Sequence, residues 1–407
     1  GNQLSVQNSF VLGMGIFIGI FWLAGALTHG EAMRTFFFQD GSDTFMDYYN
    51  SIQYGDEPYG HKVIYPPLIN VVYSILGKFV LLQGVMDRAL YLRTSQTGQV
   101  VFLFYMIGTV FLFLFFLYKV KKGTIRERVF FTAAVFLSGP MLFALERGNS
   151  ILLAVVFLLV FLWGYQAENK IFQYLSFCAL GAAAGIKISP ALFGLILLSE
   201  RRYKDAIIAG IIGIVVFMAP FVFTDGTIFS LVQNIQYANK VFQGFLVVMG
   251  NVHLIGSGPY VDLVHLVQFA GRLFNGNWIT IEQGLNLLLM VGGISGVCLC
   301  SNFPQWKKLG ILAGIIALCP QFSGIYNLLF MILPLTVFLN ESRHRKPWDW
   351  VYLFLFLGIF VPFINLQLEA FAPFWNDIYR PRISSLMESF CLMVLVTMLE
   401  IEVWYLL

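Results

Sequence analysis

The sequence predicts an all-α polytopic membrane protein. Of its 407 residues, 58% are hydrophobic and only 12% are charged, and the mean hydropathy is +0.76. A soluble domain has roughly half apolar and a quarter charged residues, so a soluble fold and a disordered chain are excluded. The apolar runs are unbroken rather than alternating, which excludes an outer-membrane barrel. The net charge of +3 indicates no nucleic-acid partner and leaves the lipid bilayer as the partner of the helices.

Apolar segments recur along the whole chain. A helix needs about 20 apolar residues to cross the hydrocarbon core. Segments of suitable character lie near residues 8–28, 64–84, 98–118, 129–145, 150–166, 172–199, 205–223, 281–301, 308–320, 324–340, 349–366 and 385–407. No linker separates them. We therefore expect one integral membrane domain over residues 1–407, with about 11–12 transmembrane or re-entrant helices.

Lysine and arginine in short loops predict the orientation, because basic loops stay in the cytoplasm. Basic clusters surround Lys121, Arg202, Lys308 and Arg345. If all four are cytoplasmic, the outward-facing loops are 29–63, 146–149, 224–280, 320–324 and 367–384.

Two apolar segments do not fit a simple crossing. Segment 64–84 includes Pro66-Pro67. If segment 8–28 runs outward and loop 119–128 is cytoplasmic, only one of the two apolar segments between them can cross, so we expect 64–84 to be a re-entrant or surface-lying element. The alternative is that loop 119–128 departs from the usual charge rule. Segment 172–199 has basic residues on both flanks and only 28 residues, too few for two crossings. Ser189-Pro190 within it is a helix-start pair. We therefore expect a broken helix pair with Lys187 at the turn.

The outward loop 29–63 carries the acidic residues best suited to catalysis. Asp43 and Asp47 are four residues apart and would share one face of a helix. A positioned carboxylate is a common general base, because it can accept the proton of a nearby hydroxyl. A solvated acidic loop is the alternative interpretation.

The outward turn Glu146-Arg147-Gly148-Asn149-Ser150 opens the next apolar segment. Asn149 or Ser150 would cap that helix, whose N-terminus carries a partial positive charge. With the charge of Arg147, the turn predicts an anion site, for which phosphate is the obvious ligand. The alternative is a polar turn with a local ion pair.

Lys187 lies in the middle of an apolar segment. A charge inside the membrane costs several kcal/mol and indicates a functional site. The alternative is a lysine that extends to the interface. Its mid-segment position favours an anion-binding role.

Other outward polar residues are candidates for acceptor or lipid binding. Arg380 and Arg382 would steer an anionic headgroup or anchor the interface. His253 is more simply a loop histidine, because no metal spacing is visible and no metal site is predicted. Gln321 and Tyr326 lie at an outward hairpin, where tyrosine belongs more often to the interface belt than to a sugar site.

The motifs, taken in chain order, resemble a known family. They are Asp43 with Tyr48-Tyr49, Pro58-Tyr59, Tyr65-Pro66-Pro67-Leu68, Arg147-Gly148-Asn149 and Gly185-Ile186-Lys187-Ile188-Ser189-Pro190-Ala191. Over roughly residues 8–340 the chain resembles glycosyltransferase family 87, a GT-C family that uses polyprenyl-phosphate sugars and includes mycobacterial mannosyltransferases. In the family pattern a Tyr follows the Asp by four residues. Here Asp47 takes that position and the Tyr pair comes one residue later, so the base is Asp43 or Asp47, and we expect Asp43.

The resemblance implies a GT-C fold and a membrane hexosyltransferase, with mannose as the favoured sugar. The donor is a polyprenyl-phosphate sugar, the acceptor a glycolipid or polysaccharide, and the anomeric centre is inverted. The residues expected around the donor phosphate and sugar are Tyr48, Tyr49, Tyr65, Glu146, Arg147, Asn149 and Lys187. No cofactor is required, although a divalent metal between Asp43 and Asp47 is compatible with the spacing. The expected location is a bacterial cytoplasmic membrane with the active site on the extracytoplasmic side.

Two other functions fit the same composition. A transporter or flippase of lipid-linked sugars would show repeats and paired broken helices, and only one broken segment is visible. A polysaccharide polymerase or ligase would carry arginine-rich outward loops, and here they hold few basic residues. A nucleotide-sugar donor is not expected, because neither a P-loop nor an Asp-x-Asp motif is present.

Overall fold

The computed structural model describes residues 5–37, 43–80, 88–250, 260–264, 266–267, 270, 279–341, 345–365 and 383–407, with the backbone alone over 242–250. These residues are helical apart from turns and one isolated antiparallel bridge, between Tyr260 and Gly324. The chain is an all-α polytopic membrane protein, as its composition predicts.

The first half of the chain forms ten helices that the structure describes. They are α1 (Val6–Leu27), α2 (Glu31–Arg34), α3 (Met46–Ile52), α4 (Pro67–Gly77), α5 (Arg88–Thr94), α6 (Gln96–Val120), α7 (Ile125–Phe136), α8 (Gly139–Arg147), α9 (Ile151–Gly164) and α10 (Lys170–Ile186).

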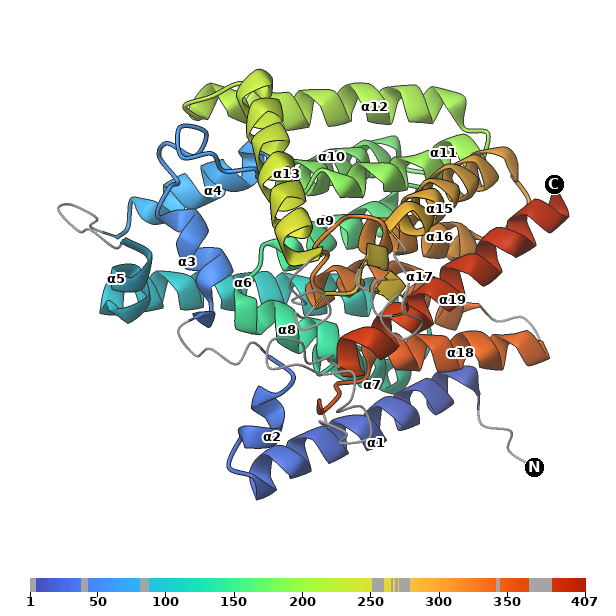
Figure 1. Ribbon diagram of the computed structural model, residues 1–407. Helices are drawn as coiled ribbons and strands as arrows, with labels where there is room; N and C mark the ends of the chain where they lie inside the picture. The colour runs from blue at the N-terminus through green and yellow to red at the C-terminus, as the bar shows by residue number, and fades with distance from the viewer. Residues whose placement is uncertain are drawn as a thin grey trace.

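The second half has 3₁₀ helices, labelled η, between some of its α-helices. They are η2 (Ser189–Gly194), α11 (Leu195–Ser199), α12 (Tyr203–Met218), η3 (Ala219–Phe223), α13 (Ile228–Gly250), α15 (Ile279–Leu299), α16 (Gln305–Leu318), η4 (Ile325–Met331), α17 (Ile332–Asn340), α18 (Pro347–Phe360) and α19 (Ile383–Leu406). Most long helices run side by side, α3, α4 and α5 gather at one end of the bundle, and α13 crosses steeply (Figure 1).

Four helical stretches are long and apolar enough to cross a membrane. They are Val6–Leu27, Gln96–Val120, Tyr203–Phe223 and Thr280–Leu299, and only 17–28% of their most apolar windows is buried inside the protein. Apolar side chains left so exposed need lipid around them. The helices α7 and α8, bent by 53°, form a fifth candidate span. The number of 11–12 membrane elements stays a prediction.

The early part of the chain follows the expected path. Between α1 and α6 the described helices α2 to α5 have only 4–11 residues. The longest, α4, extends about 16 Å, which is too short for a hydrocarbon core of about 30 Å. The described part of segment 64–84 therefore has no helix long enough to span, and α6 is the next candidate span after α1.

The broken segment is present, with one correction. α10 ends at Ile186, Lys187 is extended with φ −138° and ψ 133°, and the chain turns into η2 and α11. Ser189 does not cap an α-helix. Ile188 already has helical dihedral angles, so the helical turn begins before Ser189, which makes no side-chain capping bond.

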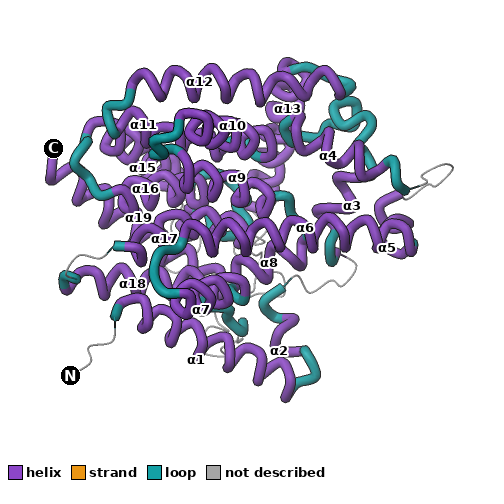
Figure 2. The backbone as a smooth tube through the Cα atoms, turned by 180° about the vertical axis from the view of Figure 1, so that it is seen from behind, coloured by secondary structure: helices purple, strands orange, loops and turns teal. Residues whose placement is uncertain are grey.

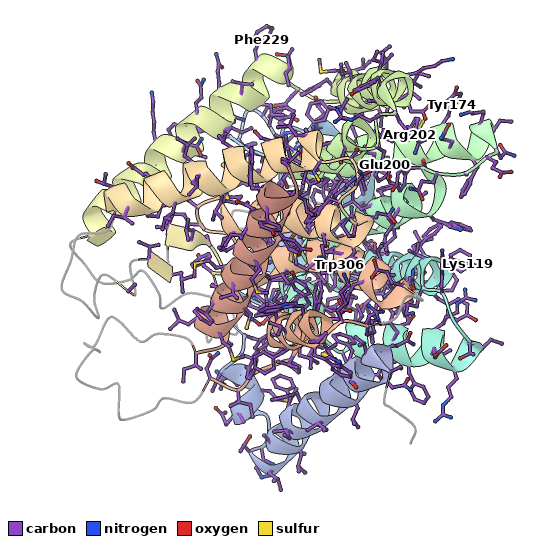
Figure 3. All side chains as sticks on the ribbon, turned by 90° about the vertical axis from the view of Figure 1, so that its right-hand side faces the viewer. Lys119, Tyr174, Glu200, Arg202, Phe229 and Trp306 are labelled. Carbon is purple, nitrogen blue, oxygen red and sulfur yellow. The ribbon has the colours of Figure 1, made fainter. Side chains whose placement is uncertain are left out.

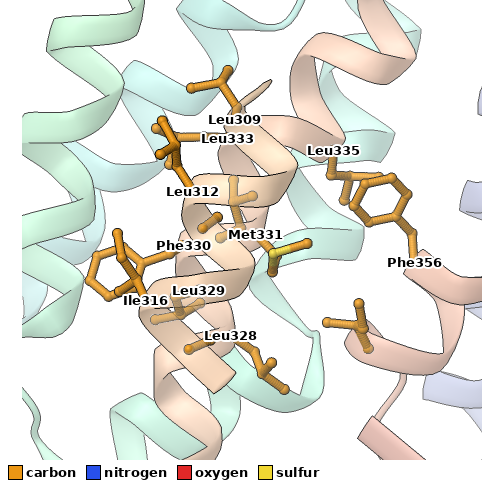
Figure 4. Close-up of a cluster of buried hydrophobic side chains, with 14 of the residues drawn as sticks. Leu309, Leu312, Ile316, Leu328, Leu329, Phe330, Met331, Leu333, Leu335 and Phe356 are labelled. Atoms are coloured by element: carbon orange, nitrogen blue, oxygen red, sulfur yellow. The ribbon is translucent and has the colours of Figure 1, made fainter. Parts of the chain in front are cut away.

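The core of the bundle is built around α16 and the helical stretch in which η4 continues directly into α17. Leu309, Leu312, Leu329 and Phe330 are buried completely or almost so (Figure 4). Trp306 on α16 is also fully buried, as Figure 3 shows among the packed helices. The first turn of η4, with Tyr326, lies near Asp47 of α3.

The basic loops meet at the opposite end of the bundle from α3, α4 and α5 (Figure 2). Lys121 follows α6 and donates hydrogen bonds to Gln7 on α1 and to Asn340 at the end of α17. These bonds hold three helices together at this end of the bundle. Arg202 directly precedes α12 and forms ion pairs with Glu200 and Asp205. Figure 3 shows Glu200 and Arg202 side by side. The grouping agrees with the predicted orientation, in which these loops share one side.

Candidate active site

Arg147 joins the two candidate acids. It is the last residue of α8, and its side chain is only 9% exposed. One guanidinium nitrogen donates to the Asp43 carboxylate at 2.5 Å and to the Asp43 carbonyl oxygen at 3.1 Å. The other donates to the Asp47 carboxylate at 2.5 Å. The planar, forked guanidinium suits two carboxylates at once, so Arg147 fixes the distance between them.

The acids do not share a helix face, contrary to expectation. Asp47 lies on α3, but Asp43 precedes the helix, and Phe45 between them is in the left-handed conformation with φ 63°. Such a conformation costs a non-glycine residue on the order of 1–3 kcal/mol. The Phe45 N–H donates to the Glu146 carbonyl oxygen at 2.7 Å. The strained turn thus places the acids against the end of α8.

Asn149 connects Asp47 to the beginning of α9. Its Oδ1 accepts a hydrogen bond from the Ile151 N–H at 2.9 Å, and its Nδ2 donates to the Asp47 carboxylate at 2.7 Å. Asn149, rather than Ser150, therefore makes the capping bond of α9. The Asp47 carboxylate therefore takes the hydrogen bonds from Arg147 and Asn149 that the turn was predicted to offer to a phosphate.

Gly148 is required by the close packing between the turn and α3. Its φ of 62° is left-handed, and a Cβ there would lie 3.0 Å from Tyr48 Cβ and 3.1 Å from the Phe102 ring. Glycine alone avoids both the strain and the clash. This packing keeps Arg147 and Asn149 on either side of the acids.

The two acids differ in availability. The side chain of Asp43 is 37% exposed and that of Asp47 17%. Both Asp47 oxygens accept hydrogen bonds, from Arg147 and Asn149. Within the described part of the chain, Asp43 uses one oxygen toward Arg147 and keeps the other open. Asp43 is therefore the better placed of the two to accept a proton from a substrate.

Lys187 places a cation beside this carboxylate pair. Its ammonium lies 5.0 Å from the centre of the Tyr326 ring and 6.0 Å from that of Tyr65. Asp47 is the charged group that acts on it electrostatically. Among the residues that the structure describes, the ammonium makes no hydrogen bond or ion pair. The positive charge of Lys187 is thus held beside aromatic rings and keeps the capacity to pair with an anion.

Three tyrosines from distant segments surround the charged groups. Tyr65 precedes α4 and Tyr326 lies on η4; both were predicted. Burial, and secondly the Asp47 carboxylate, raise the pKa of Tyr65 well above its usual range. Burial, and secondly Asp262, raise the pKa of Tyr260. These two hydroxyls therefore stay protonated and can donate hydrogen bonds to sugar or phosphate oxygens.

Tyr260 was not found from the sequence. Its segment is held against the beginning of η4, because Val261 N–H donates to Ser323 O at 2.8 Å and Ser323 N–H donates to the Asp262 carboxylate at 3.0 Å. The Tyr260–Gly324 bridge completes this attachment. The two segments are about 60 residues apart, and no short sequence motif predicts that they pair.

Two predicted site residues do not face the site. Tyr48 and Tyr49 are 0% and 1% exposed and pack with Tyr73, Phe102 and Tyr105. Successive residues of a helix point about 100° apart, so when α3 turns Asp47 toward Arg147 it turns the next residues into the core. The expectation that they contact the donor is replaced by a packing role.

The other predicted residues are mixed in their placement. Glu146 is half-buried, and one of its carboxylate oxygens has no hydrogen-bond partner among the described residues. Gln321 is exposed. His253, Arg380 and Arg382 lie outside the described residues. In the part of the chain that is described, no three His, Cys, Asp or Glu side chains form a metal-binding group.

The model of glycosyltransferase family 87 matches residues 64–301, which is more than half of the chain. The chain belongs to glycosyltransferase family 87 and is a membrane glycosyltransferase. No curated protein and no solved structure matches it. The matched stretch includes Tyr65, Arg147, Asn149 and Lys187 and begins after the two acids.

Proposed function

We propose that this protein transfers a hexose, with mannose favoured, from a polyprenyl-phosphate donor to a glycolipid or polysaccharide acceptor. The observation that supports this proposal is the position of Lys187. Among the residues that the structure describes, this cation makes no ion pair, and it lies near the Asp47 carboxylate at the end of an apolar segment. Such a place suits the phosphate of a membrane lipid. The open Asp43 carboxylate nearby suits a hydroxyl that is about to react.

In the proposed reaction, the acceptor oxygen attacks the anomeric carbon while its proton passes to Asp43. The bond from that carbon to the phosphate oxygen breaks, and its electron pair leaves with polyprenyl phosphate. Attack from the face opposite the phosphate inverts the anomeric centre. Lys187 stabilises the negative charge that grows on the leaving phosphate, and the hydroxyls of Tyr65 and Tyr260 orient the oxygens.

The proposal gives Arg147 a positioning role. Its guanidinium holds both acids and so sets the direction in which Asp43 points. Orientation of this kind converts an encounter between base and hydroxyl into a preorganised step.

We also propose that the site faces away from the cytoplasm of a bacterial cell. The acids lie on and before α3, at the opposite end of the bundle from the loops that carry Lys121 and Arg202 (Figure 2). Basic loops are retained in the cytoplasm. Lipid-linked sugars are available on the outer side, where nucleotide sugars are scarce.

The test is transfer from a panel of radiolabelled polyprenyl-phosphate sugars by the purified protein in lipid, with extract of envelope lipids as acceptors. Product from one donor identifies the sugar. No product from any donor, with polyprenyl phosphate still bound, contradicts the transferase proposal and favours the flippase.

Lys187→Met is expected to raise the donor KM by about 10–100-fold, the equivalent of one charge-assisted contact. Lys187→Arg should keep most of the affinity. The matched control is Lys62→Met, since Lys62 lies over the Tyr237 ring, outside the site, and should bind donor normally. An unchanged donor KM in Lys187→Met would show that the donor phosphate does not bind at Lys187.

Transfer is expected to persist in EDTA. Three of the four carboxylate oxygens of Asp43 and Asp47 already accept hydrogen bonds from Arg147 or Asn149, and Lys187 supplies the positive charge for the phosphate. The measurement is the initial rate before and after chelation. A loss of rate that Mg²⁺ or Mn²⁺ restores would show that the acids hold a metal.

A further inference from the structure

The Pro58-Tyr59 pair carries part of the family resemblance but lies outside the candidate active site described above. Tyr59 is only 5% exposed. It belongs to a compact turn, residues 58–63, which the hydrogen bond from Val63 N–H to Pro58 O at 2.9 Å closes. We call this segment the Tyr59 turn. Only one residue separates it from Tyr65 of the site, so the way in which the turn is held affects where Tyr65 lies.

Asp225 holds the backbone of the Tyr59 turn. It lies just after η3, and its two carboxylate oxygens accept hydrogen bonds from Tyr59 N–H at 3.1 Å and from Gly60 N–H at 2.8 Å. Hydrogen bonds to an ionised acceptor are about twice as strong as those between neutral groups. Asp225 follows Tyr59 by 166 residues. The contact therefore joins the two longest of the loops that are predicted to face outward.

Asn234 on α13 makes a second attachment to the turn. Its Nδ2 donates to Tyr59 O and to Val63 O, in both cases at 3.1 Å. Asn234 is buried, and a buried amide is stable only when such partners are present. In Figure 1, α4 and the beginning of α13 lie at the same end of the bundle. The turn is therefore held by two side chains from the segment around η3 and α13.

The ring of Tyr59 is fixed by close packing. Its centre lies 5.7 Å from that of Phe221 on η3. A Cβ added at Gly226 would lie only 2.5 Å from the Tyr59 ring, so a glycine is required where the chain passes it. Burial raises the pKa of Tyr59. The hydroxyl therefore stays protonated, and the packed ring fixes the direction in which it donates.

This hydroxyl donates to the backbone of the site. The Tyr65 carbonyl oxygen accepts from Tyr59 Oη at 3.2 Å and from Asn70 Nδ2 at 3.0 Å. The two residues after Tyr65 are prolines, which have no N–H to donate. Side chains therefore do the work of anchoring this stretch of backbone. The Tyr65 ring centre lies 6.0 Å from the Lys187 ammonium, so the anchored residue is the one beside the cation of the site.

Resting on the function proposed above, we propose that Tyr59 is a positioning residue for sugar transfer, which holds the Tyr65 backbone so that the Tyr65 ring stays beside Lys187. Asp225 and Asn234 hold Tyr59, and Tyr59 in turn holds Tyr65. The Tyr65 hydroxyl then meets the donor oxygens in one fixed direction. A donor that is already in place requires no reorganisation when negative charge develops on the leaving phosphate.

Tyr59→Phe is the first test, because it removes the hydroxyl and keeps the ring that packs against Phe221. We expect kcat for transfer to fall about three- to tenfold, the contribution of one neutral hydrogen bond. The donor KM should stay within about twofold, because Lys187 is unchanged. The measurement is steady-state transfer by the full-length protein in lipid, with the donor found in the panel.

The same change in a Tyr65→Phe background tests whether Tyr59 acts through Tyr65. Tyr65→Phe alone should lower kcat at least as much as Tyr59→Phe does. Once the Tyr65 hydroxyl is absent, there is no donor left to position. Adding Tyr59→Phe should then lower kcat by less than about twofold, since residues that act through one another are not additive.

The matched control is Tyr352→Phe. Tyr352 on α18 is 4% exposed, and its hydroxyl donates to the Glu402 carboxylate at 2.9 Å, away from the site. The control also removes one hydrogen bond from a buried tyrosine. It should lower the thermal unfolding temperature at least as much as Tyr59→Phe but leave kcat unchanged.

Two results would overturn the positioning role while transfer by the wild type still supports the proposed function. One is that the losses in Tyr59→Phe and Tyr65→Phe multiply in the double variant. The other is that Tyr59→Phe lowers only the unfolding temperature, as the control does. An absence of transfer by the wild type from every donor contradicts the proposed function itself and, with it, the positioning role, so the two failures can be distinguished.

Discussion

Asp43→Asn is expected to lower kcat for sugar transfer by about 10²–10⁴-fold, the usual contribution of a general base. The donor KM should change little, because the amide keeps the size of the side chain and can still accept from Arg147. The measurement is steady-state transfer with the donor found in the panel. Asp47→Asn should behave differently: both Asp47 oxygens are held by the protein, so its loss should also lower thermal stability.

Asp56→Asn is the control for this experiment. Asp56 belongs to the same outward loop, but its carboxylate accepts from Ser74, away from Arg147. Its replacement should leave kcat within about twofold, as for surface changes away from a site. If Asp43→Asn retains activity while Asp47→Asn loses it with its fold intact, Asp47 is the base and the assignment made from exposure is wrong.

Arg147→Met should affect both stability and rate. Breaking a buried ion pair costs about 3–5 kcal/mol. We expect the lower end, because the Asp43 side chain is 37% exposed and water screens that part of the interaction. Both acids also lose their fixed orientation, so kcat should fall at least about 100-fold. Thermal unfolding and transfer rate are measured on the same preparation.

Arg147→Lys separates charge from geometry. A lysine keeps the positive charge but cannot bridge two carboxylates with one planar group. It should recover most of the stability and little of the rate. Arg126→Met, in the basic loop at the other end of the bundle, is the control and should change neither. Full activity in folded Arg147→Lys would show that the fork between the acids has no role in catalysis.

The features that were predicted correctly depend on residues that are close together in the sequence. Hydropathy predicts the apolar helices, Pro66-Pro67 predicts that α4 is not an ordinary span, and an internal lysine before Ser-Pro predicts the break after α10. Each depends on local backbone chemistry or on the cost of a charge in lipid. Because these features depend on neighbouring residues alone, a single sequence is sufficient to predict them.

The partners of the charged groups could not be predicted in this way. Arg147 appeared to be free for phosphate, but it pairs with acids 100 and 104 residues away. The inward turn of Tyr48 and Tyr49 depends on the left-handed Phe45, an unusual conformation that residue type does not announce. Tyr260 reaches the site through contacts with the beginning of η4. All three depend on which segments meet in space.

The long separation between the acids and Arg147 has a consequence for the assembly of the enzyme during its synthesis. The ribosome makes about 5–20 residues per second. After the loop with Asp43 and Asp47 is made, α8 therefore follows only some 5–20 s later. Through that interval the acids have no arginine and must remain in water. The two acids gain their fixed geometry only when α7 and α8 insert. The site is completed later still, when the segments that carry Lys187, Tyr260 and Tyr326 have been made.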